Sequence, residues 1–185
     1  MISKPRIATV ALLVSGFFIC ISGIAGKNEA TGKDSAGSIS EDVEARRIAH
    51  AAVNAEVITT STHTGLPGEG PPSDIVDGDL TTRWSSEYSA PQEVVVNLPK
   101  VISVKRLKLF WERASAMKYL VYVSTDGKEW KNIHLAFMKM VNEPVSRIDD
   151  IDMKDVPAKM IKLSLLQCIN PEWGFSLYEM AVISE

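Results

Sequence analysis

The chain has 185 residues, of which 45% are hydrophobic and 23% are charged, and its formal net charge is −3. These values are typical of a globular protein with one domain and a tail, and they exclude collagen-like and wholly disordered chains. The 20 Lys and Arg residues do not exceed the 23 Asp and Glu residues, which argues against nucleic acid and against anionic membranes as partners.

The amino terminus has the layout of a secretory signal peptide. Lys4 and Arg6 precede an uncharged, apolar run that ends in the small residues of Gly23-Ile24-Ala25, a suitable cleavage site. We therefore expect a signal peptide over residues 1–25 and an exported protein that is secreted or held in the cell envelope or periplasm. An uncleaved anchor is the alternative, because a run of about 20 apolar residues can span a bilayer.

The next segments read as a linker and a short helix. Residues 26–40 are rich in Gly, Ser, Ala, Lys and Asp, which is typical of a flexible linker. Ser40 can cap a helix over residues 41–53, where apolar residues recur at helical spacing. Cys168 is the only cysteine beyond the signal peptide, so we expect no internal disulfide and a half-buried thiol that behaves as a small hydrophobe.

From residue 54 to residue 185 the pattern changes to short apolar segments separated by turn residues such as Asp77-Gly78. Such a series without long helices predicts an all-β domain, an antiparallel β-sandwich or jelly roll, with Trp84, Trp111 and Trp130 in its core. The segments expected to be strands are Glu56–Thr60, Glu93–Leu98, Val104–Trp111, Tyr119–Ser124, Trp130–Leu135, Val145–Ile148, Met160–Leu166 and Leu177–Ile183.

Four blocks of this region carry a recognisable pattern in chain order. The blocks are DGDLTTRWSS at 77–86, LFWERA at 109–114, YLVYVSTDGKEW at 119–130 and WGFSLYE at 173–179. Together they resemble the coagulation-factor 5/8 type C (discoidin) domain, and most closely its family 32 carbohydrate-binding modules. The resemblance implies a galactose-binding-domain-like jelly roll that binds without catalysing. Leu98-Pro99 and Ala158-Lys159-Met160 depart from the family pattern, so we do not carry over a ligand specificity.

The acidic loop has the oxygen-rich composition that a calcium ion requires, because Ca²⁺ takes six to eight hard oxygen ligands. Its central glycine lets the backbone turn sharply so that carbonyls point inward. The resemblance implies a structural ion held by Asp77, Thr82 and Glu179. Carbonyls near Asp74 and Asp79 would complete the set and tie an early loop to the last strand. The alternative is an Asx turn with solvated carboxylates.

A sugar site on such a sandwich needs an aromatic ring against the C–H face of the pyranose and a few fixed polar donors from loops. The loop residues that meet this condition are His63, Tyr88, Arg113 and Trp173. Arg113 is the strongest candidate, since the resemblance implies a sugar-contacting arginine near this loop in some members. The alternatives are a solvated loop histidine, a tyrosine that covers a turn, an ordinary surface charge and a tryptophan that plugs the core.

Catalytic interpretations find little support. The sequence has no Gly-x-Ser-x-Gly motif, and its histidines are too scattered for zinc spacing. A compact sandwich also offers no cleft between the paired carboxylates that a glycosidase needs.

We therefore predict a monomeric, non-enzymatic carbohydrate-binding module that recognises glycans and holds a structural calcium ion. The alternatives are an adhesion module for a cell-surface or extracellular protein and a phospholipid-binding module. Leu66 is the only bulky apolar residue in the longest early loop, which disfavours lipid. We expect no nucleic-acid partner, and membrane contact only through an uncleaved amino-terminal segment.

Overall fold

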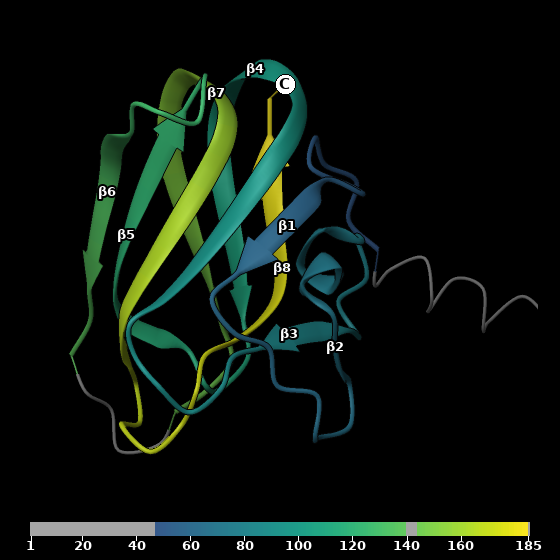
Figure 1. The fold of residues 1–185 in the computed structure, drawn as a ribbon, viewed down its shortest axis with the longest axis vertical. Helices are drawn as coiled ribbons and strands as arrows, with labels where there is room; N and C mark the ends of the chain where they lie inside the picture. The colour runs from purple at the N-terminus through teal and green to yellow at the C-terminus, as the bar shows by residue number, and fades with distance from the viewer. Residues whose placement is uncertain (1–46, 140–143, 185) are drawn as a thin grey trace, which may run out of the picture. The chain divides into compact units, whose positions relative to one another are not determined.

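The computed structural model describes residues 47–139 and 144–184, which are almost entirely β-structure (Figure 1). The elements in chain order are β1 (Glu56–Thr59), β2 (Glu69–Gly70), the 3₁₀ helix η1 (Pro72–Val76), β3 (Arg83–Ser85), β4 (Gln92–Trp111), β5 (Ala116–Ser124), β6 (Lys131–Phe137), β7 (Arg147–Cys168) and β8 (Ser176–Ile183). The expected signal peptide, the linker and residues 41–46 of the expected helix lie outside these ranges. Within them, no helix has the length and apolar character needed to cross a membrane.

The strands form one hydrogen-bonded sheet in the order β2-β3-β8-β4-β7-β5-β6, and β1 pairs with β4 outside that path. All pairs are antiparallel except β2 with β3. The first half of β4 pairs with β1 and its second half pairs with β8, with register shifts between the halves. Because β4 and β7 bend together and pass through both layers, the sheet closes as a sandwich (Figure 1). The predicted fold class is confirmed.

Two pairs of expected strands prove to be single long strands. The segments 93–98 and 104–111 both belong to β4, and 145–148 and 160–166 both overlap β7. The polar residues between them resemble turns in the sequence, but Ser103 and Val104 still pair with Pro157 and Val156 across the bend. The elements β2, β3 and η1 were not predicted, because they are too short to show an alternating pattern.

The helix expected over residues 41–53 is wrong for the part that is described. The Ile48 N–H donates to Gly78 O at 2.8 Å, and the Ala51 N–H donates to Val182 O at 2.8 Å. The segment ends in a turn at Asn54, whose φ is 61°. A short helix is marginal by itself, so hydrogen bonds to the rest of the domain determine the conformation of this segment.

The space between the layers is filled by apolar side chains, including fully buried Trp84 and almost fully buried Trp111. The prediction for Trp130 is wrong, because this residue is half-buried beside the edge strand β6, with the Lys162 ammonium 4.8 Å from its ring centroid. Cys168 is more buried than expected, at 5% exposure. Its Sγ–H donates to Gly174 O at 2.9 Å, and burial raises the pKa of the thiol, so the cysteine is a packing residue.

Candidate functional site

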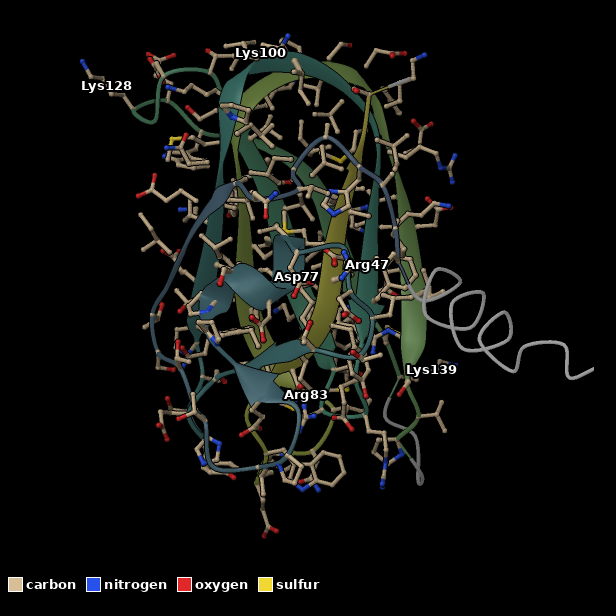
Figure 2. The ribbon with its side chains drawn as sticks, turned by 90° about the vertical axis from the view of Figure 1, so that its right-hand side faces the viewer. Arg47, Asp77, Arg83, Lys100, Lys128 and Lys139 are labelled. Carbon is tan, nitrogen blue, oxygen red and sulfur yellow. The ribbon has the colours of Figure 1, made fainter. Side chains whose placement is uncertain are left out.

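Four connections between strands meet at one end of the sandwich and surround a pocket of about 320 Å³. The connections are residues 60–68 between β1 and β2, 86–91 between β3 and β4, 112–115 between β4 and β5, and 169–175 between β7 and β8. Arg83, which also lines the pocket, is labelled in the lower half of Figure 2, and Lys100 is labelled at the upper end. Because loops build this pocket while strands fix their ends, its shape is set by the fold.

The four residues predicted from the sequence each come from a different one of these connections, and all of them line the pocket: His63, Tyr88, Arg113 and Trp173. The rings of His63 and Tyr88 meet edge to face, with 5.2 Å between their centroids. The Arg113 guanidinium carbon lies 5.8 Å from the Trp173 ring centroid. The structure therefore brings the four residues together as two pairs of side chains, each with a ring and a polar group.

His63 is held by Glu69, a pocket residue that was not predicted. The Nδ1 atom of His63 lies 2.7 Å from Glu69 Oε2, and Arg83 Nη2 lies 3.7 Å from Glu69 Oε1. Burial raises the pKa of Glu69, but hydrogen bonds from Ser85 and His63 outweigh burial and hold the pKa below its usual value. Since a carboxylate can only accept, His63 Nδ1–H must donate to it. The Nε2 atom of His63 is then the one left to meet a ligand.

Gly174 forms a wall of the pocket in close contact with the segment after β3. The Ser86 N–H donates to Phe175 O at 2.8 Å, and the Phe175 N–H donates to Ser86 Oγ at 2.9 Å. A Cβ atom at position 174 would lie 2.5 Å from Ser86 O. Only glycine allows the two backbones to approach this closely, so the wall beside Trp173 is fixed by backbone contacts.

Glu112 is a second acidic residue of the pocket that was not predicted as a ligand-binding residue. Its Oε2 accepts a hydrogen bond from the Ala114 N–H at 2.8 Å. None of the ion pairs found among the described residues includes Glu112, whereas Glu69 is matched by His63 and Arg83. The sequence could have pointed to Glu112, because it is a carboxylate next to the candidate Arg113 in a connection between two strands. Glu112 and the neighbouring Arg113 thus line the pocket as a carboxylate and a guanidinium that belong to none of these ion pairs.

Three of the predicted calcium ligands lie together. Thr82 Oγ1 donates to Asp77 Oδ2 at 2.9 Å and lies 3.0 Å from Asp79 O. The Asp79 N–H donates to Asp77 Oδ1 at 2.7 Å, which is the Asx turn named as the alternative. These oxygen atoms of Asp77, Thr82 and Asp79 are about 3 Å apart. That spacing also suits neighbouring ligands of a calcium ion, which binds oxygen at about 2.3–2.6 Å.

The fourth predicted ligand, Glu179, is occupied elsewhere. Its Oε2 accepts from the Gly78 N–H at 2.9 Å, and its Oε1 lies 3.1 Å from His50 Nε2. The Ala52 N–H donates to His50 Nδ1 at 3.1 Å, so Nε2 carries the proton and donates to Glu179. Both side chains are completely buried, and burial raises the pKa of Glu179 despite the hydrogen bond from His50. No group of three or more His, Cys, Asp or Glu residues within 47–139 and 144–184 could hold a metal in this arrangement.

Comparisons with known proteins agree with this architecture. The model of the F5/8 type C domain matches residues 57–180. Chitosan-binding module 2 of a chitosanase/glucanase from Paenibacillus sp. IK-5, solved in complex with chitotriose, is 30% identical with a TM-score of 0.64 and covers 72% of this chain and 99% of its own. A Clostridium perfringens module solved with GalNAc-β-1,3-galactose is 21% identical with a TM-score of 0.62 and covers 72% and 97%.

The polysaccharide lyase 8 family protein HylA of Enterococcus faecalis is 33% identical over 112 residues, which are 59% of this chain but only 8% of that protein. The chain therefore spans a small part of this lyase, whereas it spans nearly the whole of the carbohydrate-binding modules. The family match over residues 57–180 gives the family assignment, and the solved structures share the fold. The chain belongs to the F5/8 type C domain family, and its structural neighbours are family 32 carbohydrate-binding modules.

Proposed function

We propose that the protein is a non-catalytic module that binds a glycan in the pocket at the end of the sandwich. The observation that carries this proposal is that His63, Tyr88, Arg113 and Trp173 line one pocket from four separate connections. The rings of Tyr88 and Trp173 offer faces for pyranose C–H groups, and Arg113 and His63 offer polar atoms for hydroxyls. The volume of about 320 Å³ suits about one or two sugar residues.

Among glycans, we propose one that carries free amino groups. Glu112 places a carboxylate in the pocket without a cationic partner among the described residues. A protonated amine would supply that partner, and a charged hydrogen bond of this kind contributes about 1.5–3 kcal/mol. The similarity to a chitosan-binding module solved with chitotriose supports this class of ligand.

Calorimetric titration with chitotriose, its fully N-acetylated form and galactose tests the proposal. We expect Arg113→Ala to weaken chitotriose binding about tenfold without lowering the melting temperature. Glu112→Gln should weaken binding of chitotriose more than binding of the acetylated form. Arg106→Ala is the matched control, because Arg106 forms an exposed ion pair with Asp150 outside the pocket. Absence of millimolar binding to any of a broad set of glycans would refute the function.

We also propose that calcium stabilises the acidic loop. Burial raises the pKa of Asp74, and the charges of Asp77 and Asp79 raise it further, so a cation beside this group would relieve repulsion. Asp77, Thr82 and the Asp79 carbonyl would hold the ion, and Glu179 would have to leave His50 to join them. A melting temperature several degrees higher in calcium than in chelator, and lost in Asp77→Asn, is the expected result. Equal melting temperatures would refute calcium binding at this loop.

The remaining part of the proposal is export of the module. The apolar run that follows Lys4 and Arg6 supports removal of residues 1–25. Mass spectrometry of the protein recovered from its native envelope or medium should find an amino terminus at Gly26. Recovery of the intact chain in the membrane fraction would favour the uncleaved anchor instead.

A further inference from the structure

Arg147 and Asp149, at the start of β7, form an ion pair beside the 112–115 loop. Arg147 Nε donates to Asp149 Oδ1 at 2.9 Å, and Arg147 Nη2 lies 3.1 Å from Asp149 Oδ2. Their side chains are 16% and 19% exposed. Neither residue lines the pocket, so any effect of this pair on a ligand must pass through other residues.

The pair contacts both ends of the loop that carries Glu112 and Arg113. At the entering end, the Trp111 Nε1–H donates to Asp149 Oδ2 at 2.8 Å, and the Arg147 guanidinium lies 5.4 Å from the Trp111 ring centroid. At the leaving end, Arg147 donates to the Ser115 hydroxyl and to the carbonyl of the next residue. One guanidinium–carboxylate unit therefore fixes the residues on either side of this short loop.

Two further contacts connect the loop to its surroundings. Arg113 Nε donates to Pro144 O at 3.3 Å, shortly before Arg147 in the chain. The Ser176 N–H donates to Ala114 O at 2.8 Å, which ties the loop to the start of β8, directly after the connection that presents Trp173. Tyr119 completes the network, because its hydroxyl donates to the Asp149 carboxylate at 2.8 Å.

We propose that Arg147, held by Asp149, is a positioning residue for the glycan site, which sets the 112–115 loop so that Arg113 and Glu112 face the ligand. This inference rests on the proposed function. Arg147 suits the task because its planar fork makes several hydrogen bonds in one fixed geometry. A loop that is already ordered loses less conformational entropy when the ligand binds.

The test compares Arg147→Gln and Arg147→Lys in the full chain by calorimetric titration with chitotriose. We expect Arg147→Gln to weaken binding about fivefold, and Arg147→Lys to recover only part of that loss because an ammonium cannot reach both ends of the loop. The double variant Arg147→Gln/Arg113→Ala should lose less affinity than the sum of the two single losses, since the Arg113 contact can be lost only once and only the contribution of Glu112 remains. Fully additive losses would overturn the inference. Arg106→Gln, on the same pair of strands, is the matched control.

A measurement without ligand separates this inference from the proposed function. The Arg113 Nε–H nuclear magnetic resonance signal senses the Trp173 ring, whose centroid lies 5.8 Å from the guanidinium carbon. We expect this signal to shift in Arg147→Gln, and to a smaller extent in Arg147→Lys, but not in Arg106→Gln. An unchanged signal in both Arg147 variants overturns the positioning role even if the wild-type protein binds glycans. A shifted signal in a protein that binds no glycan refutes the function while the conformational coupling stands.

Discussion

The molecule contains two histidine–glutamate pairs in different surroundings. His63 and Glu69 line the pocket, where their side chains are 21% and 4% exposed, whereas His50 and Glu179 are both 0% exposed on the flank of the sandwich. The pKa of Glu69 is lowered and the pKa of Glu179 is raised. The pKa values of the two glutamate carboxyl groups are therefore shifted in opposite directions.

The difference follows from how many donors oppose burial at each carboxyl group. Ser85, His63 and the Leu66 N–H all lower the pKa of Glu69. Burial is the largest single cause at both groups and raises both pKa values, but at Glu179 it prevails over His50 and the Gly78 N–H, while the charge of Asp77 adds to the increase. The Glu69 carboxyl group thus keeps its charge to a lower pH at the pocket, and the buried pair serves to hold the 47–55 segment against the sheet.

The largest expected effect is the loss of the buried pair. Glu179→Ala removes the partner of His50 and of the Gly78 N–H, and breaking a buried pair of this kind costs about 3 kcal/mol of unfolding free energy. Glu69→Ala should cost about 1 kcal/mol, because water can reach the pocket and solvate His63. Denaturant unfolding of both variants measures the difference. Equal losses would show that burial does not distinguish the two pairs.

The next test uses two glycines, Gly78 beside the buried His50–Glu179 pair and Gly174 in the pocket wall. Gly78 has a φ of 77°, and its Cβ would lie 2.8 Å from Ile48 O, whereas the Cβ of Gly174 would lie 2.5 Å from Ser86 O. We expect each change to alanine to cost about 2 kcal/mol of stability, from strain and a backbone clash. Only Gly174→Ala should also weaken glycan binding, because Gly174 lines the pocket. Weakened binding in Gly78→Ala would contradict the separation of the two regions.

The sequence predicted the sandwich because alternation and turn residues are local signals. It also predicted His63, Tyr88, Arg113 and Trp173 as members of a loop site, because each follows a strand-like or turn-like segment. The continuity of β4 and β7 was missed, since the pairing of the two strands across the bend, and not the local residues, keeps them extended.

Other features depend on long-range contacts that no local pattern encodes. His50 meets Glu179 across 129 positions of the chain, within a segment that was expected to be helical. The carboxylate of Glu112 becomes informative only after the partners of Glu69, which are His63 and Arg83, are placed. Likewise, the link between Arg147 and the 112–115 loop depends on β7 folding back beside β4 and β5.

A smaller effect concerns the pocket histidine itself. His63→Ala removes from the pocket lining both the ring that packs against Tyr88 and its polar nitrogen atoms, while Glu69 keeps Arg83 nearby. We expect chitotriose binding to weaken about fivefold, which corresponds to one neutral hydrogen bond of about 1 kcal/mol. Stability should fall by less than about 1 kcal/mol. A large loss of stability with unchanged affinity would make His63 a structural residue like His50.

The smallest expected effect is a pH dependence that belongs to Glu69. Because its pKa lies below the ordinary value of 4.5 in the folded protein, the unfolded chain takes up a proton first as the pH falls. The stabilisation from Glu69 is therefore complete above 4.5 and is lost as the pH falls through the lowered value. We expect unfolding free energies measured at stepped pH to show a difference of about 1 kcal/mol or less between wild type and Glu69→Gln, which shrinks on acidification. A difference that grows on acidification would mean that Glu69 behaves like Glu179, and the contrast between the two pairs would fail.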